Sequence, residues 1–141
     1  MAHLCAHNAD TTLWARRAEV VDGVNENSEN PRYLPGRRLI DGLQATTDLE
    51  QAAASADVVI LGVASAGFPD TLEAIEPMIG TNTPIVSLAK GLDRASSRRM
   101  TELVEERLPG RPVGVLSGPN LAKQVLDGHA AATVLLSLIH I

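Results

Sequence analysis

The sequence predicts an α/β fold in which a parallel sheet carries helices on both faces. Three apolar runs, at residues 57–63, 84–88 and 113–116, have the length and β-branched content of buried parallel strands. Helical patterns separate these runs, and strand and helix alternate along the whole chain without internal repeats. Because the run at 57–63 is apolar on both faces, we expect it to be a central strand of the sheet.

The remaining elements follow from local periodicity and from helix and turn signals. Residues 2–8 resemble the last two turns of a helix, and residues 11–15 predict a short strand. Asp48 is the expected N-cap of a short helix. The further predictions are a helix at 17–27, a loop at 28–42, an edge strand at 44–47, helices at 49–55, 68–79, 96–108 and 119–127, and a last apolar run at 131–136.

Composition and charge exclude several classes of function. A chain of 141 residues is long enough for one domain with a real core. Its formal net charge of −5 argues against a general nucleic-acid or membrane-surface role, since both favour a basic face. The single cysteine, Cys5, excludes an internal disulfide and favours a cytoplasmic protein. No apolar run reaches the ~18 residues of a membrane span, and the first residues do not resemble a signal peptide.

Two strand ends bring a cation and a glycine turn to the carboxyl edge of the predicted sheet, where such sheets bind ligands. Lys90 follows the strand at 84–88, and Ser-Gly-Pro-Asn at 117–120 follows the strand at 113–116. A lysine at this place needs an anion or a carbonyl dipole, and the free amides of a helix start can bind a phosphate or carboxylate. We therefore expect Lys90 and residues 117–120 to share an anion-binding pocket. The alternatives are a snorkelling surface lysine and a capped turn without chemical interest.

Arg16 and Arg17 follow the predicted strand at 11–15. In a Rossmann domain that selects NAD, the end of the second strand usually carries an acidic residue that binds the ribose 2′-hydroxyl. Two guanidiniums suit the 2′-phosphate of NADP instead, so NADPH is the favoured cofactor. The alternative is a solvated arginine pair at a helix start, where the helix dipole mildly disfavours cations.

Both ends of the chain differ from what a dinucleotide-binding domain normally has. The chain contains no Gly-x-Gly-x-x-Gly turn and opens on what resembles the tail of the helix that such a turn begins. We expect residues 1–135 to be a partial NAD(P)-binding domain, truncated at both ends, with a gap in the sheet that exposes apolar flanks. Residues 136–141 can be encoded by CTGTCTCTTATACACATC, a sequencing-library adaptor, so we expect a non-native tail. An ordinary apolar strand end is the alternative.

The histidines do not predict a metal site. His3 and His7 stand one helical turn apart, which is the spacing of a zinc pair, but no third ligand is near them in the sequence. We expect His129 to be a loop residue, His140 lies in the suspected tail, and Cys5 is expected to be a small buried hydrophobe.

Four motifs in register resemble the N-terminal domain of bacterial NAD(P)-dependent glycerol-3-phosphate dehydrogenase. They are Leu-Trp-Ala-Arg-Arg at 13–17, Asn-Pro-Arg-Tyr-Leu-Pro-Gly at 30–36, Ser-Leu-Ala-Lys-Gly-Leu at 87–92 and Leu-Ser-Gly-Pro-Asn-Leu-Ala at 116–122. The resemblance implies reversible hydride transfer from NAD(P)H to dihydroxyacetone phosphate. The product, sn-glycerol 3-phosphate, begins membrane phospholipid synthesis. It also implies a C-terminal helical domain, absent here, that carries the lysine acting as general acid/base.

The resemblance also implies roles for residues of this chain. We expect no catalytic residue in it, so the fragment alone should be inactive. The apolar flanks that the gap in the sheet exposes should also make the fragment poorly soluble. For the full-length protein the resemblance allows a homodimer in the cytoplasm, without nucleic acid or membrane insertion. The implied cofactor contacts are Arg16, Arg17, Tyr33, Lys90 and, through its backbone, Ala122; the implied substrate contacts are Lys90, Gly118 and Asn120.

Two other functions remain open from the sequence. One is another Rossmann dehydrogenase, of the 3-hydroxyisobutyrate or ketopantoate reductase type, which dependence on a substrate phosphate would separate from the first. The other is a non-catalytic nucleotide-binding module, which would need the phosphate-binding turn that this sequence lacks.

Overall fold

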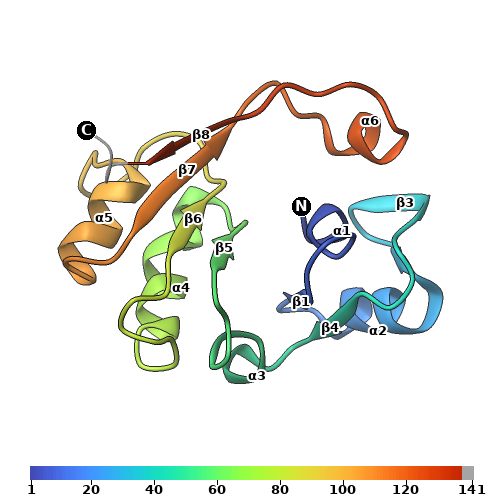
Figure 1. The fold of residues 1–141 in the computed structure, drawn as a ribbon, viewed down its shortest axis with the longest axis horizontal. Helices are drawn as coiled ribbons and strands as arrows, with labels where there is room; N and C mark the ends of the chain where they lie inside the picture. The colour runs from blue at the N-terminus through green and yellow to red at the C-terminus, as the bar shows by residue number, and fades with distance from the viewer. Residues whose placement is uncertain (138–141) are drawn as a thin grey trace. The chain divides into compact units, whose positions relative to one another are not determined.

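A computed structural model describes residues 1–137, and in it helices and strands alternate along the chain, which confirms the predicted α/β class (Figure 1). The elements are α1 (Ala2–Cys5), β1 (Thr12–Trp14), α2 (Ala18–Asn27), β2 (Glu29–Asn30), β3 (Leu34–Arg38), β4 (Gln44–Thr46), α3 (Leu49–Ala53), β5 (Val59–Leu61), the 3₁₀ turn η1 (Ser65–Gly67), α4 (Phe68–Ile75), β6 (Ile85–Ser87), α5 (Met100–Arg107), β7 (Val113–Ser117), α6 (Ala122–Leu126) and β8 (Val134–Ser137).

The chain divides into two compact units. Unit 1 consists of Met1–Ala52 together with Leu121–Ala130. Unit 2 consists of Ala53–Asn120 together with the described residues from Ala131 onward. Neither unit is one continuous stretch, because residues 121–130 return to unit 1 after most of unit 2 has been formed.

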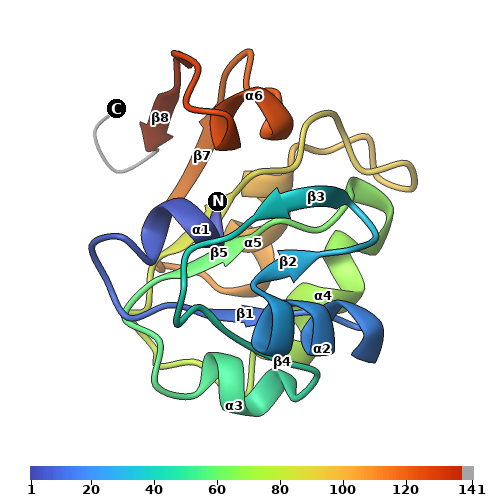
Figure 2. The same cartoon turned by 90° about the vertical axis from the view of Figure 1, so that its right-hand side faces the viewer.

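Unit 1 is built on a parallel pair of strands and one helix (Figure 2). Strand β1 pairs with β4 in the register Leu13↔Ala45, and β4 pairs with no other described strand, as predicted for an edge strand. Helix α2 packs its buried valines against this pair because Val20 and Val24 lie four residues apart on one helical face. The core consists of Val20, Val24, Leu39, Leu43 and Ala45.

The hairpin β2–β3 lies where the sequence predicted a loop over residues 28–42, so that prediction was wrong. Its strands are short and contain Pro35 and Gly36, which weaken any strand pattern. A side chain helps to hold the hairpin instead: the Glu29 carboxylate accepts a hydrogen bond from the Gly36 amide at 2.7 Å. Gly36 has a φ of 73°, a conformation that favours glycine.

The predicted N-cap at Asp48 is confirmed. Its carboxylate oxygen Oδ1 accepts hydrogen bonds from the amides of Glu50 at 2.9 Å and Gln51 at 3.1 Å. These are amides that the first turn of α3 leaves without helical partners. The side chain of Asp48 therefore sets where α3 begins.

Unit 2 contains a four-stranded sheet in the order β5-β6-β7-β8. The first three strands are parallel, as predicted for the runs at 57–63, 84–88 and 113–116. Strand β8 is antiparallel to β7, with Ser117 opposite Val134, so the all-parallel prediction was wrong at its last strand. After α6 the chain re-enters the sheet at the end where β7 finished, so β8 runs back alongside β7 in the opposite direction.

Strand β5 is not the central strand that its apolar sequence predicted. It lies at the end of the sheet order and pairs only with β6 among the described strands. Val58 and Ile60 are 49 % and 38 % exposed, in keeping with a strand that has one described neighbour. An apolar run predicts burial but cannot tell how many neighbours a strand finds in the described chain.

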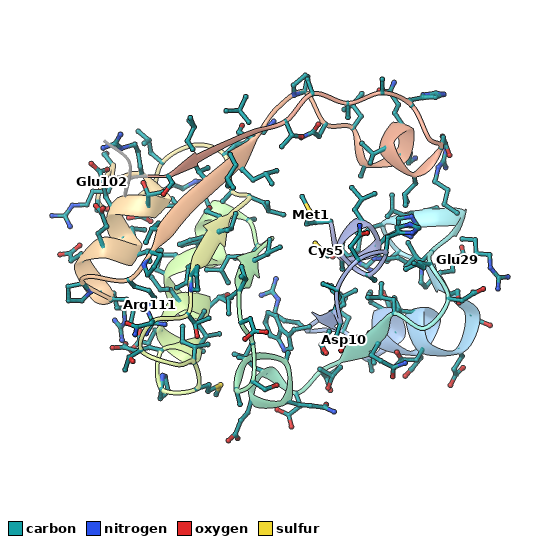
Figure 3. All side chains as sticks on the ribbon, in the orientation of Figure 1. Met1, Cys5, Asp10, Glu29, Glu102 and Arg111 are labelled. Carbon is teal, nitrogen blue, oxygen red and sulfur yellow. The ribbon has the colours of Figure 1, made fainter. Side chains whose placement is uncertain are left out.

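Helices α4 and α5 supply most of the core of unit 2. Phe68, Leu72 and Ile75 of α4 are almost completely buried, as is Val104 of α5. Both helices are shorter than predicted, because α4 ends at Ile75 and α5 begins only at Met100. Arg111, labelled in Figure 3, donates hydrogen bonds to the carbonyl oxygens of Gly80 and Thr83 and so connects two loops at the ends of the strands.

The suspected tail is only partly described. Leu136 and Ser137 lie in β8, and residues 138–141 lie outside the described residues. The origin of residues 136–141 therefore stays a prediction. The described helices include none that is both long enough and apolar enough to cross a membrane.

Candidate functional site

The ammonium of Lys90 lies at the turn formed by residues 117–120, as the sequence predicted. This turn is called the glycine corner below. Its Nζ donates a hydrogen bond to the carbonyl oxygen of Gly118 at 2.9 Å. Lys90 reaches this place from the end of β6, and Gly118 follows β7, so two adjacent parallel strands position the pair. A lysine ammonium has three N–H donors, which leaves two for other partners.

A buried serine fixes the backbone that connects β6 to Lys90. Ser87, the last residue of β6, is fully buried, and its Oγ accepts a hydrogen bond from the Ala89 amide at 3.2 Å. This contact satisfies a hydroxyl that would otherwise be buried without a partner. It also sets the direction in which the chain leaves the sheet toward Lys90.

Gly118 is surrounded by the chain's own backbone. A Cβ atom at this position would lie 2.1 Å from the Ala132 carbonyl oxygen and 3.1 Å from Nδ2 of Asn120. No side chain fits there unless the backbone moves. The sequence predicted a glycine that lets the backbone approach a ligand, and the observed close approach is to residues 131–133.

Asn120 is held by a residue that the sequence reasoning missed. Its Nδ2 donates a hydrogen bond to Oγ1 of Thr133 at 2.8 Å. Its Oδ1 is buried and has no hydrogen-bond partner within the described part of the chain. The pairing of β8 with β7 places Thr133 beside this corner, and no local pattern in the sequence predicts that pairing.

A cavity of about 360 Å³ adjoins Lys90 in unit 2. This volume suits a small metabolite. Thr101, at the start of α5, is 7 % exposed and was not singled out from the sequence. The cavity is lined by Ala89, Lys90, Gly91, Arg99, Met100, Thr101, Val115 and Ser117.

The charge of Arg99 in that lining is balanced by Glu102, which is labelled in Figure 3. The guanidinium of Arg99 donates to Oε1 of Glu102 at 2.9 Å, and the Arg99 amide donates to Oε2 at 2.7 Å. The side-chain hydrogen bond is the main reason that the pKa of Glu102 falls to about 2, and the backbone bond adds to it. Lys90 is therefore the cation of this cavity that lacks a carboxylate partner among the described residues.

Arg16 and Arg17 lie at the carboxyl end of β1, as predicted. Arg17 is the N-cap of α2, and β1 continues its pairing through a hydrogen bond from the Ala15 amide to the Thr46 carbonyl at 3.0 Å. Both arginine side chains are exposed, and within residues 1–137 neither has an ion-pair partner. Two free guanidiniums at a strand end and a helix start are suited to binding a phosphate.

Tyr33 lies in the turn of the β2–β3 hairpin and is 62 % exposed. The Arg32 guanidinium stands over the Tyr33 ring, 5.7 Å from its centroid. Arg32 also donates to the Glu19 carboxylate at 3.2 Å, which ties this turn to the first turn of α2. Tyr33 is thereby held on the side of unit 1 where α2 begins.

Ala122 is the first residue of α6 and is exposed. Helix α6 is attached to the hairpin by Arg37, which donates to both carboxylate oxygens of Asp127, at 3.0 and 2.9 Å. These hydrogen bonds lower the pKa of Asp127 and raise the pKa of Arg37. Ala122, Arg16, Arg17 and Tyr33 belong to unit 1, whereas Lys90, Gly118 and Asn120 belong to unit 2.

The two N-terminal histidines form a structural contact. Their rings meet edge to face with centroids 5.0 Å apart, and Nδ1 of His3 accepts a hydrogen bond from the Ile40 amide at 2.8 Å. The described residues contain no group of three or more His, Cys, Asp or Glu side chains that could hold a metal ion. Cys5, labelled on α1 in Figure 3, is half-buried rather than buried.

The sequence and the fold of this chain are similar to those of known glycerol-3-phosphate dehydrogenases. A glycerol-3-phosphate dehydrogenase [NAD(P)+] from Sphingopyxis alaskensis is 49 % identical over 135 residues, which are 96 % of this chain and 40 % of that protein. The one from Mycobacterium avium is 46 % identical over 136 residues, with the same coverage. A crystal structure of glycerol-3-phosphate dehydrogenase from Coxiella burnetii superposes with a TM-score of 0.88 at 30 % identity, covering 97 % of this chain and 42 % of that one.

The chain thus spans about 40 % of the length of the curated relatives that it matches. The family model described as "NAD-dependent glycerol-3-phosphate dehydrogenase N-terminus" matches residues 1–138. The chain therefore belongs to this family of glycerol-3-phosphate dehydrogenase N-terminal domains.

Proposed function

We propose that this chain is the cofactor-binding part of an NAD(P)-dependent glycerol-3-phosphate dehydrogenase, which reduces dihydroxyacetone phosphate to sn-glycerol 3-phosphate. The observation that carries the proposal is the 2.9 Å hydrogen bond between Lys90 and Gly118. It joins the two motifs that the sequence singled out, and it leaves ammonium protons available beside a cavity of small-molecule size.

Unit 1 holds the proposed cofactor contacts. The unpaired guanidiniums of Arg16 and Arg17 bind the 2′-phosphate of NADPH, and this interaction makes NADPH the preferred cofactor over NADH. Tyr33 offers an exposed ring next to the same helix start, where it can pack against the nucleotide. The backbone of Ala122 adds a further contact.

Unit 2 holds the proposed substrate contacts. Lys90 contacts both cofactor and substrate, and its positive charge stabilises negative charge that develops on the substrate carbonyl oxygen during reduction. Gly118 and Asn120 line the same corner. The nicotinamide supplies the hydride when the cofactor is bound, and the residues of this chain bind and orient the two reactants.

We assign no general acid or base to this chain. The lysine that serves this role in the resembling family lies in the C-terminal domain, so the chain alone binds ligands without catalysing the reaction. In the full-length protein, glycerol 3-phosphate leaves as a precursor of membrane phospholipids, in the cytoplasm, and a homodimer is the proposed assembly.

A chimera tests this function. In it, the present chain replaces the matching segment of the Sphingopyxis alaskensis relative, to which it is 49 % identical. We expect oxidation of NADPH that depends on dihydroxyacetone phosphate, and at least a hundredfold lower kcat/KM for Lys90→Met, since removing one donor to a developing oxyanion typically costs about 10²–10³ in rate. Lys123→Met is the matched control. Turnover of non-phosphorylated ketopantoate, or full activity of Lys90→Met, would contradict the proposal.

A further inference from the structure

Residues 131–133 run beside the glycine corner of unit 2. The pairing of β7 with β8 ends with Ser117 opposite Val134, so the residue after Ser117 and the residue before Val134 face each other. The Ala132 carbonyl oxygen occupies the space that a side chain at position 118 would need. Thr133, one residue further, meets Asn120. This short segment therefore forms one wall of the corner that holds Lys90.

The Asn120 amide is only partly used by the fold. An asparagine side chain has two N–H donors and one carbonyl acceptor. Thr133 takes one donor at 2.8 Å, and Oδ1 has no partner within the described residues although it is buried. Buried polar atoms are almost always paired in folded proteins, so the described fold leaves the hydrogen bonding of the Asn120 amide incomplete.

Thr133 itself is exposed, and its hydrogen bond to Asn120 spans thirteen positions of the chain. An exposed threonine contributes little to a core, so this contact serves the geometry of Asn120 more than the stability of the sheet. A hydroxyl at position 133 can hold the amide, and a methyl group in its place cannot.

We propose that Thr133 is a positioning residue, which fixes the Asn120 amide so that it forms a hydrogen bond with a hydroxyl group of the substrate. The inference rests on the proposed function, because it takes the corner of Lys90, Gly118 and Asn120 as the substrate site. Dihydroxyacetone phosphate and glycerol 3-phosphate both carry such a hydroxyl group. Thr133 acts on the substrate through its hydrogen bond with Asn120 and does not itself take part in the reaction.

Kinetics of the chimera test the inference. Thr133→Val raises KM for dihydroxyacetone phosphate about tenfold and leaves kcat within about twofold, because it removes a binding contact shared by the ground and transition states. Thr133→Ser keeps the hydroxyl and restores KM. Thr71→Val is the matched control: the Thr71 hydroxyl donates to the carbonyl oxygen of Gly67, the N-cap of α4, at 2.8 Å, and its loss leaves KM unchanged.

A second measurement separates positioning from folding. The side-chain NH₂ signals of Asn120 are followed by NMR in the chimera while glycerol 3-phosphate is added. They shift on addition in the wild type and in Thr133→Ser, and they do not shift in Thr133→Val. An unchanged KM, or an equal NMR shift, in Thr133→Val overturns the inference while the proposed function stands. A wild-type chimera without dihydroxyacetone phosphate reduction overturns the proposed function and this inference with it.

Discussion

Arg37 binds both carboxylate oxygens of Asp127, although ninety positions of the chain separate the two residues. Two parallel N–H···O bonds fix the relative orientation of the guanidinium and the carboxylate, which a single bond would not do. Because Asp127 follows α6 directly, this pair attaches α6 to the β2–β3 hairpin of unit 1. The hairpin was missed from the sequence, and so was this attachment.

Removing the Arg37–Asp127 pair should loosen α6 without unfolding unit 1. We expect faster amide hydrogen exchange at residues 123–127 in both Arg37→Ala and Asp127→Asn, and no additional increase in the double variant, since both changes remove the same interaction. Arg38→Ala is the control, because Arg38 pairs locally with Asp41. Additive effects in the double variant would mean that the two residues act independently.

The N-cap at Asp48 should contribute measurably to stability. Asp48→Ala removes the acceptor of two amides in the first turn of α3 and should lower the free energy of unfolding by about 1 kcal/mol. Asp48→Asn keeps an oxygen in the same place and should stay close to the wild type. Urea denaturation followed by circular dichroism measures both. Equal losses in the two variants would assign the effect to charge rather than to capping.

The hydrogen bond from Ile40 to His3 should make stability depend on pH. Burial lowers the pKa of His3 below its ordinary value of 6.5, and the nearby His7 and the N-terminus lower it further. The folded state therefore favours the neutral ring, whose contribution is present above pH ~6.5 and is lost as the pH falls through the folded pKa. The difference in melting temperature between wild type and His3→Gln should shrink from pH 8 to pH 5. A constant difference would exclude His3 as the titrating group.

The free edge of β5 should drive self-association of the isolated chain. Ile60 is 38 % exposed, on a strand that pairs on one side only within the described sheet. A lysine on an edge strand opposes edge-to-edge pairing, so Ile60→Lys should slow aggregation severalfold without lowering the melting temperature. Light scattering checks this against Leu121→Lys, which removes an even more exposed apolar group, 61 % against 38 %, that lies outside any strand. If both variants slowed aggregation equally, the added positive charge alone would explain the effect, and the edge of β5 would not.

Arg16 and Arg17 should decide between the two nicotinamide cofactors. In the chimera, replacing both by alanine should raise KM for NADPH at least tenfold and change KM for NADH by less than about twofold, because only NADPH carries the 2′-phosphate. The measurement is the ratio of KM for NADPH to KM for NADH, taken at fixed ionic strength. Arg94→Ala, on an exposed loop of unit 2, controls for the loss of positive charge.

The parts of the molecule that local chemistry determines could be predicted from the sequence. Lys90 and Gly118 follow adjacent parallel strands, and the carboxyl ends of such strands meet at one edge, so their proximity followed from strand recognition alone. Asp48 was recognisable as a cap for the same reason: its role involves amides two and three residues away.

The parts that depend on distant pairing could not be predicted. The direction of β8 depends on where the chain re-enters the sheet after α6, and Thr133 reaches Asn120 only through that direction. The edge position of β5 depends on which strands are its neighbours, and its own apolar residues are compatible with a central place as well. Periodicity indicates which side chains of a segment are buried, whereas the direction of β8 and the edge position of β5 depend on which other segments lie beside them.

The return of residues 121–130 to unit 1 has a consequence for synthesis on the ribosome. Domains usually fold one after another as they emerge, the N-terminal one first. Residues 1–52 pack with a segment that is made only after residue 120, so unit 1 completes its packing only when most of unit 2 has been synthesised. The surface of unit 1 that residues 121–130 cover therefore stays exposed until those residues emerge, and during that interval it is open to chaperone binding or to aggregation.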